Sequence, residues 1–399
     1  MLFVVSKHNL EVSLGIIEPV IDLAAESQPI SYVRFEVTET TEEGKSPCLT
    51  LSATNLGQFI VTKVAQVESD PDGGLAGGVV LLPYTFLSRI LERFPEGKIL
   101  ISTWDDGRAV VKMNGLEFYV AGLPACAFPG FPQAGVEYAY TFKAETLSGC
   151  LRRASCAVST DATRRVLNGV LFSYTDSCGS VSFASTNGRY ISTEGAETDY
   201  SSCWHGDFDI VVPTKAVSLI CHVADQLPKN QMCKIGSSKE IAKFEFGETT
   251  VYSQLLHGKF PDVWQYVRTE FASSDFMHVI VGRVALLSLL ERVTAIAPGR
   301  DAQFCEISFY DGCMRVKARD GYNKADGKIQ VKYKADSDNF GFVADVRCLC
   351  ASLKAIRKKT LSLCVRKSCA DDEIKFALVS PPDAYGISRN LLISLWQSC

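Results

Sequence analysis

The feature that most constrains how this chain folds is an internal repeat that occurs three times. Three segments each begin with an apolar, alternating strand that runs directly into an amphipathic helix. The strands centre on Phe3, Phe142 and Val279, which are 139 and 137 residues apart. Because solenoid repeats have periods of about 20–50 residues, this much longer period indicates repeated domains.

A second strand followed by a helix occurs later in each segment. These strands contain Val80, Val212 and Val343, which are 132 and 131 residues apart. One third of the 399 residues is 133, so the repeat accounts for the whole chain. We therefore predict three similar domains, which cover residues 1–134, 135–268 and 269–399.

The remainder of each segment alternates in hydrophobicity as β-strands do. In the first segment, residues 105–107 (Asp-Asp-Gly) and 114–115 (Asn-Gly) separate three such stretches as typical hairpin turns. Two helices and several strands per segment predict an α+β fold with the helices on one face of the sheet. Proline-containing stretches at 128–132 and 259–262 are the expected linkers. The pattern places helices at residues 9–22, 86–94, 145–158, 215–227, 283–297 and 346–358.

Composition and charge exclude two classes of protein. Hydrophobic residues make up 47% and charged residues 22% of the chain, which excludes a mainly disordered protein. Lys and Arg number 41 against 45 Asp and Glu, for a net charge of −4. This balance excludes a uniformly basic nucleic-acid-binding protein, but it allows a basic face on an acidic body.

The fifteen cysteines form neither a disulfide framework nor a zinc pattern. Residues 1–7 lead into patterned sequence without the regions of a secretion signal, so we expect a cytoplasmic protein with reduced thiols. No Cys-x-x-Cys occurs and there are five histidines, so we expect no metal site. No apolar stretch reaches 18 uncharged residues, so we expect no membrane partner.

Motifs that would indicate catalysis are absent from the sequence. The chain has no Gly-x-x-x-x-Gly-Lys-Ser/Thr loop, no Gly-x-Ser-x-Gly turn and no His-Glu-x-x-His. The glycine-rich stretch 73–78 is not followed by a lysine, and His222 lies among apolar residues, which favours a half-buried structural role. We therefore predict no catalytic residue and no cofactor. An enzyme built on repeated α+β domains is the less favoured alternative.

Basic side chains recur at outward positions of equivalent helices. A solvated helix face explains any one of them, but their recurrence indicates a surface that follows a phosphate backbone without reading bases. The helix at 9–22 contains no Lys or Arg and does not share the pattern. The recurring positions are Arg89, Arg152, Lys215, Arg347, Lys354 and Lys358.

Three motifs resemble one known family. Residues 164–169, Arg-Arg-Val-Leu-Asn-Gly, are similar to an Arg-Tyr-Tyr-Leu-Asn-Gly run. Residues 186–191, Thr-Asn-Gly-Arg-Tyr-Ile, are similar to Thr-Asp-Gly-His-Arg-Leu, and residues 258–262, Gly-Lys-Phe-Pro-Asp, to Gly-Arg-Phe-Pro-Asp. These runs belong to the β sliding clamps of bacterial DNA polymerase III, and their order and spacing match over essentially the whole chain. The chain resembles a divergent member of that family.

The resemblance implies three clamp domains per chain and a head-to-tail homodimer that closes a ring around duplex DNA. Helices would line the hole and sheets would form the outside. Such a clamp binds DNA without sequence preference and makes the polymerase processive by tethering it. Its implied partners are a second copy of the chain, double-stranded DNA, and the polymerase catalytic subunit and clamp loader, which bind through short peptides. The alternative is a clamp-like peptide-binding module that is not loaded on DNA.

The resemblance also assigns residues. Arg189-Tyr190 stands where the family has His-Arg, and the tail that ends at Cys399 lacks the family's Met-Pro-Met-Arg. The implied partner-peptide pocket, between the second and third domains, contains Leu167, Thr186, Gly188, Arg189, Ile191, Pro261, Tyr266, Ile393, Leu395 and Trp396. Arg164 and Arg165 join the recurring basic positions in the DNA-facing set. The dimer seam would contain the stretch 116–121, with Phe118 and Val120, together with Phe86 and Ile90.

Overall fold

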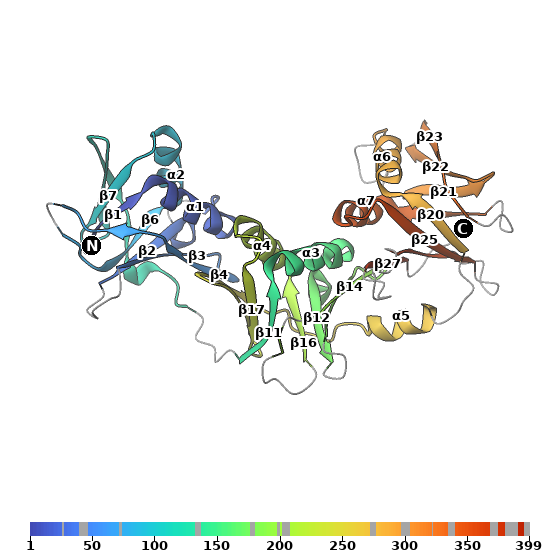
Figure 1. Cartoon of the computed structure of the whole chain (residues 1–399), viewed down its shortest axis with the longest axis horizontal. Helices are drawn as coiled ribbons and strands as arrows, with labels where there is room; N and C mark the ends of the chain where they lie inside the picture. The colour runs from blue at the N-terminus through green and yellow to red at the C-terminus, as the bar shows by residue number, and fades with distance from the viewer. Residues whose placement is uncertain are drawn as a thin grey trace. The chain divides into compact units, whose positions relative to one another are not determined.

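The predicted strand–helix pairs occur in all three segments of the computed structural model (Figure 1). The first pairs are β1 (Leu2–Ser6) with α1 (Lys7–Ile17), β11 (Glu137–Lys143) with α3 (Ala144–Ala154), and β20 (Met277–Gly282) with α6 (Arg283–Thr294). The second pairs are β6 (Gly78–Pro83) with α2 (Tyr84–Arg93), β16 (Phe208–Pro213) with α4 (Thr214–Gln226), and β24 (Phe340–Asp345) with α7 (Val346–Ala355).

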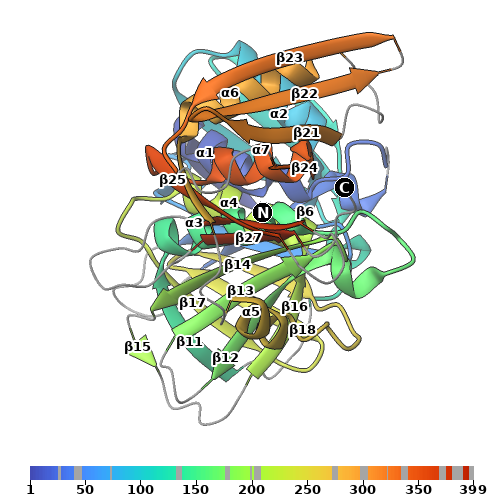
Figure 2. The same ribbon diagram turned by 90° about the vertical axis from the view of Figure 1, so that its right-hand side faces the viewer.

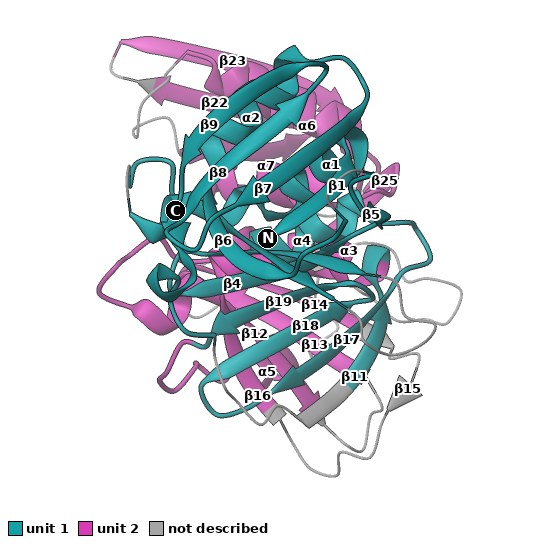
Figure 3. Ribbon diagram, turned by 90° about the vertical axis from the view of Figure 1, so that its left-hand side faces the viewer, with its two compact units in different colours: residues 1–145, 199–204, 218–255 teal, residues 146–198, 205–217, 256–399 magenta. Residues whose placement is uncertain are grey.

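The structure describes most of the chain, in two compact units that Figure 3 colours separately. Unit 1 contains residues 1–145, 199–204 and 218–255, and unit 2 contains residues 146–198, 205–217 and 256–399. The described residues are 1–25, 28–39, 47–71, 74–131, 137–175, 180–197, 200–201, 208–271, 277–296, 304–320, 322–333, 340–367, 374–379 and 390–394.

Local chemistry sets helix ends that differ from the predicted ones. The first helix begins at Lys7, two residues early, because the Ser6 hydroxyl caps it by accepting the Asn9 N–H at 3.2 Å. It ends at Ile17 rather than at residue 22, because Pro19 lacks the N–H that would continue it, and the 3-10 turn η1 (Glu18–Val20) follows. The helices predicted to end at 158 and 358 end at 154 and 355. The predicted end at 297 lies outside the described residues.

Unit 1 holds a five-stranded sheet, in the order β5-β1-β7-β8-β9, and a ten-stranded sheet, in the order β10-β6-β2-β3-β4-β19-β18-β17-β11-β15. Pairing of β4 with β19 joins the first predicted domain to the second, with the Thr62 and Thr249 hydroxyls 2.8 Å apart in the buried interior. The other strands are β2 (Tyr32–Thr38), β3 (Cys48–Thr54), β4 (Gln58–Val64), β5 (Val67–Glu68), β7 (Lys98–Thr103), β8 (Arg108–Met113), β9 (Leu116–Ala121), β10 (Leu123–Pro124), β15 (Tyr200–Ser201), β17 (Met232–Ser237), β18 (Ile241–Phe246) and β19 (Thr249–Gln254).

Unit 2 also holds two sheets, one of which joins two predicted domains. Its eight-stranded sheet has the order β16-β12-β13-β14-β27-β26-β25-β20, and its four-stranded sheet has the order β23-β22-β21-β24. Pairing of β14 with β27 joins the second predicted domain to the third, so each junction lies inside a continuous sheet. The three domain boundaries themselves stay a prediction. The remaining strands are β12 (Gly169–Thr175), β13 (Ser180–Thr186), β14 (Tyr190–Glu197), β21 (Phe304–Tyr310), β22 (Cys313–Asp320), β23 (Asn323–Gln330), β25 (Thr360–Lys367), β26 (Ile374–Val379) and β27 (Asn390–Ser394).

His222, the cysteines and the helices were each the subject of a prediction. His222 is half-buried, and its Nε2 lies 2.8 Å from the carbonyl oxygen of Gly15, which fits the structural role predicted for it. The cysteines in the described ranges are free thiols, and burial raises the pKa of Cys305 and of Cys348 to about 12. In the same ranges, no three His, Cys, Asp or Glu side chains converge as metal ligands. None of the helices in the described part of the chain has the length and apolar character needed to cross a membrane.

Candidate functional site

A row of paired residues crosses the junction in the eight-stranded sheet of unit 2. Directly opposed residues of an antiparallel pair point to the same face of a sheet. Thr186 and Ile191, two of the predicted pocket residues, therefore share a face with Cys364 and His278 at the other end of the row. The backbone register of this row is Thr186, Ile191, Ile393, Ala377, Cys364 and His278.

Helix α5 (Val263–Phe271) covers this face, and in Figure 2 it lies in front of the strands. Val263 is 2% exposed, and Trp264, Tyr266 and Val267 are partly buried in the same apolar cluster. The sheet residues of that cluster are Leu171, Ala184, Ile191, Val211 and Cys364. The face therefore has an apolar floor that is already covered by α5.

The sequence prediction missed α5, although a signal for it was present. The stretch 259–262 was expected to be a linker only. The Asp262 carboxylate accepts the Gln265 N–H at 2.9 Å, which is an N-cap contact, and apolar residues follow at helical spacing. An Asp before Val263, Tyr266 and Val267 is the pattern that could have predicted the helix.

The predicted pocket residues differ in their burial. Leu167, in the 3-10 turn η5 (Arg165–Asn168), is buried, as are Thr186 and Ile191. Three others, Gly188, Arg189 and Pro261, are exposed, and Tyr266 is partly buried. Ile393 lies on β27, where its backbone pairs with Ile191, whereas Leu395 and Trp396 lie outside the described residues. The structure thus brings Ile191 and Tyr266 into one cluster beside an exposed edge.

A tight turn between β13 and β14 forms that edge. The Asn187 side-chain oxygen accepts the N–H groups of Arg189 and Tyr190, both at 2.9 Å. Gly188 has a φ of +86°, a conformation that favours glycine because it has no Cβ. The turn leaves Arg189 exposed, with its guanidinium 5.9 Å from the centre of the Phe304 ring.

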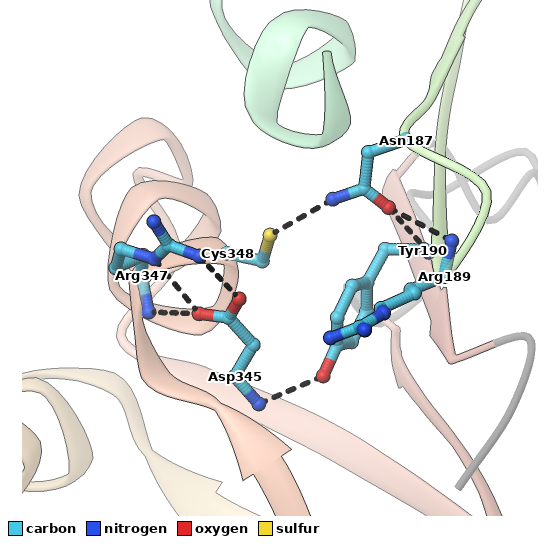
Figure 4. A network of polar contacts seen from close by, with 6 residues as sticks. All are labelled: Asn187, Arg189, Tyr190, Asp345, Arg347 and Cys348. Atoms are coloured by element: carbon cyan, nitrogen blue, oxygen red, sulfur yellow. Dashed lines mark hydrogen bonds and ion pairs between the residues drawn. The ribbon is translucent and has the colours of Figure 1, made fainter. Parts of the chain in front are cut away.

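A polar network connects this turn to helix α7 (Figure 4). Tyr190 is 2% exposed, and its hydroxyl accepts the backbone N–H of Asp345 at 2.7 Å. The Asp345 carboxylate accepts the Arg347 N–H at 2.9 Å and lies 3.0 Å from the Arg347 guanidinium. The hydrogen bond and charge of Asp345 raise the pKa of Arg347, against a smaller effect of burial. Sequence reasoning placed Arg189 and Arg347 in separate sites and did not connect them.

All eight predicted DNA-facing residues are exposed, on the helices α2, α3, α4 and α7 or on turns. Ion pairs between described residues include Lys354, Arg347 and Arg164. The Lys354 ammonium lies 2.9 Å from the Glu291 carboxylate, Arg347 pairs with Asp345, and the Arg164 guanidinium is 4.0 Å from Asp161. The exposed set is Arg89, Arg152, Arg164, Arg165, Lys215, Arg347, Lys354 and Lys358.

The four predicted seam residues lie on β9 and α2, at one edge of the five-stranded sheet. Phe118 packs edge-on against Phe86, with 6.4 Å between ring centroids. Ile90 and Val120 are buried in the same protomer, with 8% and 5% exposure, so they have little surface to offer a partner. The large hydrophobic residues that β9 exposes are Leu116 and Tyr119, at 51% and 75%, and both lie in the predicted stretch 116–121.

Three repeats of two helices, joined through continuous sheets, define the fold class of the sliding clamps. The clamp structure from Bartonella birtlesii bound to griselimycin aligns over 100% of both chains, with a TM-score of 0.83 and 19% identity. The Bacillus subtilis clamp structure aligns over 100% of this chain and 99% of that one, with a TM-score of 0.81 and 16% identity.

Sequence comparison shows the same likeness. Residues 141–262 match the family described as DNA polymerase III beta subunit, central domain. The beta sliding clamp of Synechococcus elongatus is 23% identical over 367 residues, which cover 91% of this chain and 92% of that protein. The beta sliding clamp of Chlamydia trachomatis is 24% identical over 320 residues, covering 80% and 70%. The chain is a divergent relative of the bacterial β sliding clamps, as its motifs predicted.

Proposed function

We propose that this chain is a DNA sliding clamp that encircles duplex DNA and tethers the replicative polymerase. The observation that carries the proposal is the threefold repeat of the clamp fold over the full chain, in a relative of the β sliding clamps. A clamp acts topologically, because a tethered polymerase stays at high effective concentration beside its template. This action requires no catalytic residue, cofactor or metal, and it takes place in the cytoplasm.

Ring closure would occur between two copies of the chain, head to tail. Two sheet edges support this assembly. Strand β9 ends the five-stranded sheet of unit 1, and β23 ends the four-stranded sheet of unit 2. An edge strand exposes unpaired backbone groups, and pairing β9 of one copy with β23 of the other would satisfy them in a closed ring.

The lining of the ring would hold DNA through long-range charge. The predicted cations are exposed, while the chain as a whole has a net charge of −4. A basic lining on an acidic body attracts the phosphate backbone at one surface and repels it elsewhere. Such contacts do not read bases, so the clamp remains free to slide.

Partner proteins, including the polymerase and the clamp loader, would bind by short peptides at the face covered by α5. The apolar floor around Ile191 and the exposed turn at Arg189 support this assignment. An apolar anchor of the peptide would contact the floor, while its polar groups would meet the turn. Access to that floor requires α5 to shift, because α5 covers it.

Solution mass and DNA topology test the proposal together. Light scattering should give twice 43.7 kDa at micromolar concentration. After loading, the protein should remain on nicked circular DNA and leave once the circle is cut, because a ring slides off a free end. A stable monomer that binds partner peptides but gives no topological retention would instead support the peptide-binding module.

A further inference from the structure

Tyr190 belongs to β14 but is buried in the core of the following repeat. Apart from Tyr190 and Ala157, every buried member of that cluster comes from residues 279–365. Tyr190 is also among the largest side chains that are fully buried in the described part of the chain. Its ring therefore crosses the junction between the second and third predicted domains.

The tyrosine hydroxyl is placed at the start of α7. It accepts the backbone N–H of Asp345, the N-cap residue, at 2.7 Å, and both groups are buried. A buried backbone N–H that loses its partner has a desolvation cost, so this contact holds the N-cap residue in place. The first turn of α7 is thus located by a residue from another repeat.

The N-cap carboxylate in turn orients Arg347. One Asp345 oxygen accepts the Arg347 N–H at 2.9 Å, and the other lies 3.0 Å from Nη2 of the guanidinium. The Asp345 side chain is 5% exposed, whereas that of Arg347 is 65% exposed. A buried, fixed carboxylate therefore directs an exposed cation (Figure 4).

The turn that carries Tyr190 has a second contact with the same helix. The Asn187 amide donates to Sγ of Cys348 at 3.8 Å, and its oxygen holds the Tyr190 N–H. Asp345 and Cys348, which flank Arg347 in the sequence, are thus both contacted from the edge of the proposed peptide site.

We propose that Tyr190 is a positioning residue for Arg347, and that it links the edge of the peptide site to a DNA-facing charge on α7. This inference rests on the proposed clamp function. A partner peptide that moves the 187–190 turn changes the placement of Arg347, and DNA contact at Arg347 favours one arrangement of the turn.

A double-mutant cycle in the full-length protein tests this link. Tyr190→Phe removes the hydroxyl and keeps the ring, and Arg347→Gln removes the charge. Each single variant should shorten the half-time on nicked circular DNA. The slope of its salt dependence should fall by at most about the contribution of one phosphate contact. In the Arg347→Gln background, Tyr190→Phe should have no further effect. Tyr140→Phe, which removes a buried hydroxyl from β11, is the matched control and should behave as the parent.

Hydrogen exchange at the Asp345 amide gives a readout that does not depend on DNA. Tyr190→Phe should accelerate it by about tenfold, the effect of one lost hydrogen bond. Two results would overturn the positioning role and leave the clamp function intact. One is an unchanged exchange rate at the Asp345 amide in Tyr190→Phe. The other is an equal effect of Tyr190→Phe on DNA retention in the parent and in the Arg347→Gln background. Failure of the parent protein to stay on circular DNA would remove the clamp function itself, even where the amide responds as expected.

Discussion

The Nε atom of Arg153 lies 2.8 Å from Oε2 of Glu194, and the Glu194 side chain is only 1% exposed. This ion pair links α3 to β14 within unit 2. Burial lowers the pKa of the Arg153 guanidinium, but the hydrogen bond and charge of Glu194 outweigh that effect and raise it overall. The pair thus anchors the helix that carries Arg152 to the strand that carries Tyr190.

Removing one partner of this pair should destabilise unit 2 strongly. Glu194→Ala leaves a guanidinium that is largely enclosed without its counter-ion, and we expect a loss of about 3–5 kcal/mol in the free energy of unfolding. Asp106→Ala breaks the exposed pair with Arg108, at 2.6 Å, and should leave the free energy of unfolding almost unchanged. Urea unfolding followed by circular dichroism compares the two. Equal midpoints would contradict the importance of the buried pair.

Truncation of the chain end tests the peptide site. Deletion of residues 395–399 removes Leu395 and Trp396, and we expect partner-peptide affinity to fall by about tenfold while the dimer mass stays unchanged. A longer deletion, from residue 391, would remove most of β27, which pairs with both β14 and β26, and would disrupt the sheet. Fluorescence anisotropy with a labelled polymerase peptide measures the affinity. Parent-like binding by the shorter truncation would exclude the chain end from the site.

Two lysines on different helices should contribute unequally to DNA retention. The Lys354 ammonium lies 2.9 Å from the Glu291 carboxylate, which already offsets part of its charge. No acidic partner of Lys215 occurs among the ion pairs of the described residues. We therefore expect Lys215→Gln to flatten the salt dependence of retention more than Lys354→Gln does.

The salt dependence is measured as the half-time on nicked circular DNA at several salt concentrations. Arg152→Glu, Lys215→Glu and Lys354→Glu combined should shorten that half-time at every concentration. A larger effect of Lys354→Gln than of Lys215→Gln would show that the Glu291 pair does not reduce the contribution of Lys354.

The edge strand β9 should control dimerisation through its exposed side chains. Tyr119→Lys places a charge at a 75% exposed position of the proposed seam, and we expect the dimer dissociation constant to rise by tenfold or more. Leu23→Lys changes a hydrophobic residue outside β9 that is 50% exposed, and it serves as the control. Light scattering over a dilution series reports the mass. A dimer unaffected by Tyr119→Lys would move the seam elsewhere.

Much of the fold could be predicted from the sequence, because strand alternation and helical spacing are local properties. The strand–helix pairs follow from such patterns, and the apolar positions Val346, Leu349 and Leu353 of α7 are buried as their spacing requires. The family motifs were also readable, because they are short and contiguous. The helix ends were less accurate, since single contacts such as the Ser6 cap decide them.

Local patterns were enough to predict the threefold α+β repeat, the likeness to the sliding clamps and the exposure of the basic helix positions. How distant segments combine depends instead on the packing of the folded chain. Helix α5 is held by an apolar floor drawn from strands far away in the chain, and Tyr190 is buried in the next repeat through the pairing of β14 with β27. Alternation along β14 predicts that a residue is buried, but only the strand order decides which core it enters and which N–H its hydroxyl meets.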